Sequence, residues 1–212
     1  IMVMALKPIY DLAKIKRVIV STYQAVSGAG KEGIDELDAQ VREHSEGREM
    51  TANILPSASA EKHYPIAFNL IPQIDVFCDN LYTKEEMKMV NETKKIMEDY
   101  EMRITATTIR VPVYRSHSES VNIELEKEVD LGAMREALAK FPGVTVQDDP
   151  SKQEYPMPLY TSEKDDVYVG RLRRDESCEK SYNMWVVGDQ IRKGAALNTL
   201  QIAETMIKNG WI

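Results

Sequence analysis

The sequence contains few cysteines, few aromatic residues and no excess of positive charge. Only two of its 212 residues are cysteines, and aromatic residues make up 7% of the chain. Lysines and arginines number 27 against 34 aspartates and glutamates, which leaves a net charge of −7. Nucleic acids and anionic membranes bind basic surfaces, so this balance argues against both as partners.

Long apolar runs are also absent. None approaches the roughly 20 residues that a membrane-spanning helix requires, and no signal peptide is visible. Cys78 and Cys178 lie far apart and have no metal-ligating neighbours, so we expect a reduced, cytoplasmic setting and no bound metal. Neither cysteine is flanked by groups that activate a thiolate, and we interpret both as structural.

The composition and the hydrophobic periodicity indicate a globular domain with a β-rich centre. Hydrophobic residues make up 43% of the chain and charged residues 29%, which is ordinary for a globular protein with a buried core. The patterns predict strands at 17–26, 104–113, 121–126, 144–147, 166–175 and 181–187, and helices at 31–46, 83–99, 131–141 and 191–208. We therefore expect an α+β or α/β fold with a mixed β-sheet.

The first ten residues resemble the middle of an apolar helix. No Ser, Thr, Asp or Asn precedes them as a cap, although helices usually begin with such a residue. We therefore expect the chain to be a fragment whose N-terminal part is missing.

A polar corner between the two central extended runs carries His117, which follows the string Arg110-Val-Pro-Val-Tyr-Arg-Ser. Pro112 favours extended backbone and a strand end. Histidine has an ordinary pKa of about 6.5, and neighbouring arginines would lower this pKa. A lone histidine in a turn is more often a solvated surface residue, so a catalytic role depends on other motifs.

Two further polar sites lie near predicted helix starts. Gln24 precedes the turn Ser27-Gly-Ala-Gly30, where glycines and a helix N-terminus could expose backbone N–H groups to an anion; most such turns, however, bind nothing. Thr83 and Glu86 have the spacing of a capping box, a purely structural role for Glu86. Lys88 could equally be a solvated helix residue.

Four strings occur in one order along the chain: Ser21-Thr-Tyr-Gln-Ala-Val-Ser-Gly-Ala-Gly30, Glu85-Glu-Met-Lys88, Arg110-Val-Pro-Val-Tyr-Arg-Ser-His-Ser-Glu119 and Gly194-Ala-Ala-Leu-Asn198. Together they resemble the C-terminal catalytic and dimerisation domain of aspartate-semialdehyde dehydrogenase, over essentially the whole chain. The first and third strings are specific. The resemblance implies a glyceraldehyde-3-phosphate-dehydrogenase-like C-terminal domain, a mixed β-sheet with helices on one face and a homodimer surface on the other.

The resemblance also implies an oxidoreductase of amino-acid biosynthesis, on the route to lysine, threonine and methionine. This family interconverts aspartyl phosphate and aspartate semialdehyde with NADP and phosphate, through a cysteine thiolate. The matching residues imply these roles: acid/base for His117, orientation of the substrate for Gln24, the substrate carboxylate for Arg110, the substrate amino group for Glu86, phosphate for Lys88, and cofactor contacts for Ser27, Gly28 and Asn198.

The family's Asn-Cys-Ser/Thr nucleophile string and its glycine-rich NADP-binding domain would lie before Ile1, and this sequence contains neither. We therefore expect the chain alone to be inactive and NADP to be bound mostly by the missing N-terminal domain. Residues 1–190 would form the catalytic and dimerisation domain, and residues 191–212 a helix that packs on the nucleotide-binding domain.

Two alternatives remain open from the sequence. N-acetyl-glutamyl-phosphate reductase shares the fold, the thiolate chemistry and a similar glycine turn. The string Ser21-Thr-Tyr-Gln24 and the string from Arg110 to Glu119 favour the aspartyl substrate instead. The other alternative is a dimerisation module that keeps the fold without catalysis.

Overall fold

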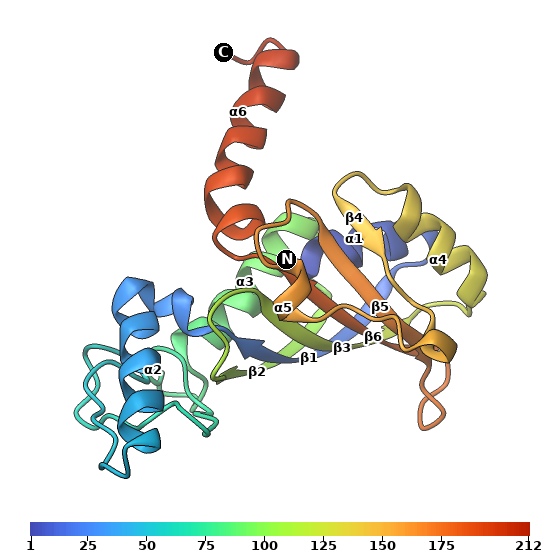
Figure 1. Cartoon of the computed structure of the whole chain (residues 1–212). Coiled ribbons are helices and arrows are strands. Elements are labelled where there is room, and N and C mark those ends of the chain that lie inside the picture. The colour runs from blue at the N-terminus through green and yellow to red at the C-terminus, as the bar shows by residue number, and fades with distance from the viewer.

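The computed structural model describes residues 1–212 and contains one mixed, six-stranded sheet (Figure 1). The spatial order of the strands is β2-β1-β3-β6-β5-β4. Their bounds are β1 Ile15–Gln24, β2 Arg103–Arg110, β3 His117–Leu125, β4 Val144–Val146, β5 Val167–Arg174 and β6 Ser181–Gly188. The expected mixed sheet is therefore confirmed.

Strand direction brings several polar residues to one edge of this sheet. β1 and β2 are parallel, and their last residues, Gln24 and Arg110, are register partners. β3 runs antiparallel to both β1 and β6, so its first residue, His117, lies opposite Gly188 at the end of β6. His117 thus begins a strand and does not lie in the preceding polar corner, because its backbone pairs with β6.

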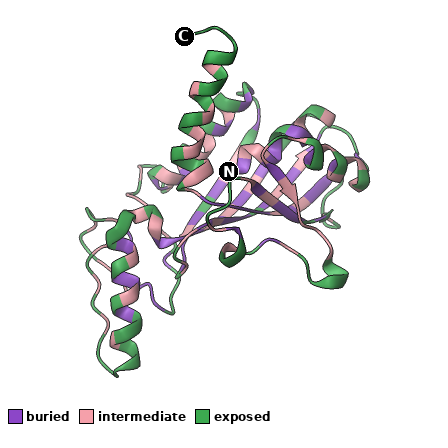
Figure 2. Ribbon diagram, turned by 45° about the horizontal axis from the view of Figure 1, so that its top comes forward, coloured by how far each residue is buried: buried purple, intermediate pink, exposed green.

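Helices cover one face of the sheet, as expected. They are α1 (Met2–Leu12), α3 (Lys84–Met97) and α4 (Leu131–Lys140). Leu6 and Ile9 of α1 pack with Val18 of β1 and Ile123 of β3 in one apolar core. Figure 2 shows this core as a buried band along the strands and the inner sides of the helices. Burial of such side chains stabilises a fold by about 2 kcal/mol each.

The other face of the sheet is more polar. Residues that alternate with the core positions lie there, among them Ser120 and Asn122 of β3, which are exposed and half-buried. The rings of Tyr23 and Trp185 meet on this face with their centroids 5.5 Å apart. This face therefore combines aromatic and polar side chains. The helices α1, α3 and α4 lie on the opposite face of the sheet.

The capping box predicted from the sequence is confirmed, and a second cap begins α4. The Thr83 side chain accepts a hydrogen bond from the backbone N–H of Glu86, and the Glu86 carboxylate accepts one from the backbone N–H of Thr83. Asp130 caps α4 through the backbone N–H groups of Gly132 and Ala133. Caps of this kind stabilise a helix by roughly 1 kcal/mol each.

α2 (Gly30–Ser45) lies to one side of the sheet with the long segment 46–83 wrapped around it (Figure 1). A short 3₁₀ helix, Val26–Ala29, connects β1 to α2. The buried Gln40 side chain accepts hydrogen bonds from the backbone N–H groups of Ile66 and Ala67. Segment 65–77 contributes only an isolated bridge to the sheet, between Ile71 and Arg110.

The C-terminal helix α6 (Leu197–Lys208) extends away from the rest of the chain (Figure 1). It follows a π-helical turn at Arg192–Ala196, so the single helix expected at 191–208 has two parts. None of the residues of α6 is buried, and Leu200, Ile202 and Ile207 are exposed. No helix in the structure has the length and apolarity that a membrane span requires. Short elements at Pro150–Lys152 and Pro158–Thr161 complete the chain.

Candidate active site

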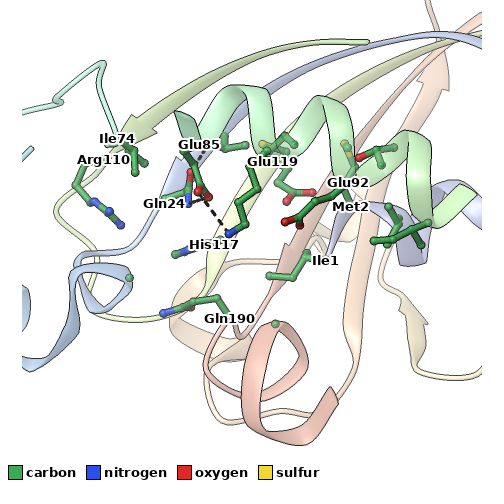
Figure 3. Close-up of a pocket in the computed structure, with 18 residues that line it drawn as sticks. Ile1, Met2, Gln24, Ile74, Glu85, Glu92, Arg110, His117, Glu119 and Gln190 are labelled. Carbon is green, nitrogen blue, oxygen red and sulfur yellow. Dashed lines mark hydrogen bonds and ion pairs between the residues drawn. The ribbon is translucent and has the colours of Figure 1, made fainter. Parts of the chain in front are cut away.

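A cavity of about 380 Å³ opens where β1 and β2 end and β3 begins (Figure 3). Helix α3 forms one wall and the first residues of α1 lie at its rim. The polar and charged side chains that line it are Thr22, Gln24, Glu85, Lys88, Glu92, Thr93, Arg110, His117, Glu119 and Gln190. Four of the residues singled out in the sequence, Gln24, Lys88, Arg110 and His117, are therefore brought together, and Gly28 lines the same cavity.

The backbone of a single residue, Ala25, forms hydrogen bonds with both His117 and Arg110. The Ala25 N–H donates a hydrogen bond to Nδ1 of His117 at 3.0 Å. The Ala25 carbonyl accepts a hydrogen bond from Nη1 of Arg110 at 2.7 Å. An acceptor Nδ1 carries no proton, so the neutral imidazole has its proton on Nε2.

Burial keeps the His117 ring neutral. The pKa of His117 is lowered to about 3, first by burial and then by the positive charges of Arg110 and Lys88. Burial disfavours the charged form of an imidazole, and nearby cations add to this effect. His117 therefore offers an N–H donor from Nε2 at physiological pH.

Gly28 leaves the space that these two side chains occupy. A Cβ atom at this position would lie 2.7 Å from Nη1 of Arg110 and 3.4 Å from Cε1 of His117. The first distance is shorter than real contacts allow, so a side chain at position 28 would displace the Arg110 guanidinium. The absence of a side chain at Gly28 therefore lets Arg110 and His117 pack closely against the turn.

Arg110 is buried and only partly engaged. Its Nε atom has no hydrogen-bond partner, and Nη1 binds only the Ala25 carbonyl. Burial lowers the pKa of Arg110 to about 10, against the opposing influence of Glu85. The guanidinium remains charged at neutral pH, and a planar cation with unused N–H groups is suited to a carboxylate.

Glu85 connects Gln24 to Lys88. The Gln24 Nε2 atom donates to Glu85 Oε1 at 3.3 Å, and Gln24 Oε1 accepts from Thr22 Oγ1 at 3.1 Å. The Lys88 Nζ atom lies 3.6 Å from Glu85 Oε2. These contacts orient the Gln24 amide. Lys88 lines the cavity, and its side chain remains partly exposed to solvent.

Glu86 needs a correction. The resemblance implied that it meets a substrate amino group, but both of its oxygens accept backbone N–H groups, from Thr83 at 2.8 Å and from Thr108 at 2.9 Å. Glu86 does not line the cavity, whereas its neighbour Glu85 does. Because the string contains two adjacent glutamates, the sequence alone does not tell which of them faces the substrate. The direction in which each side chain leaves α3 decides this, and it places Glu85 at the cavity.

The residues implied for the cofactor do not lie in one place. Ser27 accepts a hydrogen bond from Gln190 Nε2 at 2.5 Å, and Gln190 Oε1 in turn accepts the backbone N–H of Ser116 at 3.0 Å. Gly28 and Gln190 line the cavity around His117. Asn198 instead lines a second cavity of about 490 Å³, between α6 and the turn at Gly143.

The cavity also contains residues that the sequence analysis did not single out, among them Glu85, Gln190 and Glu119. Glu119 could have been found, because side chains two residues apart on a strand share a face and Glu119 follows His117 by two positions. Gln190 carried no local signal. Both cysteines are free, and neither lines the cavity.

Comparison with known proteins gives consistent matches. The family described as "Semialdehyde dehydrogenase, dimerisation domain" matches residues 6–193. Aspartate-semialdehyde dehydrogenase from Aquifex aeolicus is 53% identical over 211 residues, which is 100% of this chain and 60% of the relative. The Bacillus subtilis enzyme of the same name is 50% identical over 208 residues, covering 98% of this chain and 60% of the relative.

A solved structure is similarly close. The crystal structure of aspartate semialdehyde dehydrogenase II from Vibrio cholerae, complexed with ASA, is 44% identical and superposes with a TM-score of 0.91. The match covers 98% of this chain and 59% of that chain. This chain therefore spans about 60% of the length of the curated relatives it matches.

Proposed function

We propose, because the chain belongs to the semialdehyde dehydrogenase dimerisation-domain family, that it is the substrate-binding and dimerisation part of an NADP-dependent aspartate-semialdehyde dehydrogenase acting in the cytoplasm. The observation that carries this proposal is the cavity in which Ala25 ties His117 to Arg110 beside Gln24. The reaction would interconvert aspartyl phosphate and aspartate semialdehyde.

Arg110 would bind the carboxylate of the substrate. Its guanidinium is buried at one end of the cavity and retains N–H groups that no protein atom uses. A planar cation can bind a carboxylate through two parallel hydrogen bonds, which lysine cannot reproduce. Glu85, in place of Glu86, would meet the substrate amino group, and Lys88 would attract phosphate as a point charge.

His117 would act at the reacting carbonyl. A donor N–H on Nε2 can stabilise the negative charge that develops on the carbonyl oxygen when a nucleophile attacks it. For His117 to accept a proton at Nε2, the ring would have to protonate Nδ1 and break its bond to Ala25. In the acid/base role proposed for His117, the ring would therefore start with its proton on Nε2 and act first as a donor. Gln24 would hold the substrate through its oriented amide.

The nicotinamide end of NADP would lie at the glycine turn and not at Asn198. Gly28 lines the cavity beside His117, and without a side chain its backbone can be approached closely by a ligand. Ser27 and Gly28 would hold the nicotinamide end, and Asn198 faces a different cavity. Bound NADP would accept the hydride in this chemistry, and most of its binding surface would come from a nucleotide-binding domain outside this chain.

Other parts of the enzyme would complete the site. Ile1 lines the same cavity as His117, so a cysteine nucleophile on a segment that leads into Ile1 would arrive beside the imidazole. Residues 191–212 would pack on the nucleotide-binding domain, since α6 exposes Leu200, Ile202 and Ile207. A second copy of the chain would cover the face of the sheet that carries Tyr23 and Trp185.

Complementation tests this proposal. The chain is co-expressed with the upstream segment of its own gene, and phosphate-dependent formation of NADPH from aspartate semialdehyde is measured. We expect activity only when both pieces are present and a loss of about 10²- to 10⁴-fold in His117→Ala. His44→Ala is the matched control, because His44 is an exposed histidine on α2.

Three outcomes would contradict the proposal. Turnover that is indifferent to His117→Ala would remove the catalytic assignment. A folded complex without turnover would leave only a dimerisation module. Activity of this chain by itself would show that the upstream segment is unnecessary.

A further inference from the structure

Glu119 is the one buried carboxylate residue to which the structure gives no hydrogen bond. It lies in β3 between Thr22 of β1 and Val186 of β6, on the face of the sheet that His117 shares. Only 6% of its surface is exposed. Its Oε2 atom is buried without a partner, and the side chain lines the cavity of the candidate active site (Figure 3).

The other buried carboxylates have clear partners. Glu36 and Glu86 accept backbone N–H groups, Asp99 accepts the Tyr10 hydroxyl, and Asp189 pairs with Arg115 at 2.6 Å. These contacts explain why their negative charge is tolerated inside the fold. A partner for Glu119 must therefore come from a proton or from what enters the cavity.

The charge of Glu119 is poised near neutral pH. Burial raises the pKa of Glu119 to about 7. A carboxyl that is half protonated at neutrality and lies in a cleft is a candidate functional group. In its neutral form it has an O–H that can donate a hydrogen bond to an oxyanion.

The surrounding charges determine how Glu119 responds to a ligand. The titratable or charged side chains that face the cavity from the neighbouring elements are Glu85, Lys88, Glu92, Arg110 and His117. His117 is neutral and Glu85 is engaged by Gln24 and Lys88. Arg110 and Lys88 attract an anion, whereas an ionised Glu119 in the same space would repel it.

We propose that Glu119 is a proton-linked anion-binding residue, which takes up a proton when a doubly charged oxyanion of the phosphate class enters the cavity beside Lys88 and Arg110. This inference rests on the proposed function, because it concerns the phosphate step of that reaction. Protonation removes the repulsion and supplies a hydrogen-bond donor. Binding of the anion and of the proton at Glu119 then favour each other.

Sulfate is the appropriate probe, because it remains a dianion across the relevant pH range. Isothermal titration of the chain with sulfate, in two buffers of different ionisation enthalpy, measures affinity and proton uptake together. We expect uptake of a proton on binding above pH 7. Affinity should fall by up to roughly 30-fold between pH 6 and pH 8.5, since the free carboxyl ionises in this range.

Three variants separate the explanations. Glu119→Gln keeps the shape and cannot ionise, so its sulfate affinity should lose most of the pH dependence and of the proton uptake. Glu92→Gln makes the same change at an exposed carboxylate of the same cavity and should behave like the original chain.

The third variant, Lys88→Met, tests the anion site itself. Sulfate binding that weakens in Lys88→Met, but has the same pH profile in Glu119→Gln as in the original chain, would overturn the role of Glu119 and leave the proposed function intact. Sulfate binding that is absent, or indifferent to Lys88→Met, would overturn the phosphate site of the proposed function and with it this inference.

Discussion

Nδ1 of His117 accepts a hydrogen bond from the backbone N–H of Ala25, with 3.0 Å between the two nitrogens. The contact joins the first residue of β3 to the residue that follows β1. It determines the tautomer of the ring and, with burial, opposes protonation. The chemistry available to His117 is thus decided by a backbone group more than ninety positions away in the sequence.

His117 should remain neutral in the folded chain well below its ordinary pKa. In ¹⁵N NMR spectra its ring should show the Nε2–H tautomer from pH 8 down to pH 5, because its pKa is lowered to about 3. His44 and His63 provide internal comparisons within the same spectra. A His117 ring that titrates near pH 6.5 would contradict the burial and the Ala25 contact.

The same shift makes stability depend on pH with a defined sign. The unfolded chain protonates His117 below about pH 6.5 and the folded chain does not, so the free energy of unfolding falls as pH falls from 6.5 toward 3. The penalty should reach about 3 kcal/mol at pH 4.5. Urea unfolding of His117→Gln at pH 7 and pH 4.5 should show a smaller decline than the original chain, with His44→Gln as the control.

Glu119→Gln should stabilise the fold at alkaline pH. The unfolded chain ionises this carboxyl above about pH 4.5 and the folded chain only above about pH 7, so the original chain loses stability between these values. The variant should gain about 3 kcal/mol at pH 8 and about 1 kcal/mol at pH 5. Equal unfolding midpoints for the two chains in urea at pH 8 would mean that Glu119 has a partner when ionised.

Gly28→Ala should disturb the site more than the fold. Its Cβ would lie 2.7 Å from Nη1 of Arg110, so the guanidinium must move and its bond to the Ala25 carbonyl lengthens. Overpacking of this kind costs about 1–3 kcal/mol of the free energy of unfolding. Gly194→Ala is the control, since its Cβ meets only an ordinary contact at 3.4 Å. Urea unfolding measures the loss of stability, and the His117 NMR signal reports the disturbance of the site. If neither changes in Gly28→Ala, the turn accommodates a side chain without strain.

Substitutions of Glu85 and of Glu86 should have different effects on stability and on activity. Glu86→Ala removes acceptors for two backbone N–H groups, of Thr83 and Thr108, and should lower the free energy of unfolding by about 1–3 kcal/mol. Glu85→Ala should leave stability nearly unchanged, because Glu85 contacts only side chains at the cavity. In the complemented enzyme Glu85→Ala should raise KM for aspartate semialdehyde. The reverse pattern would return the substrate role to Glu86.

Local patterns in the sequence were sufficient for most of the helices and strands and for the mixed sheet. Thr83 with Glu86 and Asp130 with its helix predict caps, because a cap depends on residues three or four positions apart. Alternation along β3 and the β-branched run of β1 predict strands for a similar reason. The ordered strings also indicated the family, and they placed Gln24, Arg110 and His117 in one site.

Tertiary structure alone decided how the site is assembled. It assigned the cavity to Glu85 and the cap to Glu86, it separated Asn198 from Gly28, and it left Glu119 buried without a partner. It also brought Ala25 to His117 and Arg110. These outcomes depend on strand register and side-chain direction, which arise from pairing between segments far apart in the chain. The sequence by itself determined which residue types are present at the site, and packing determined which of their atoms remain free to act.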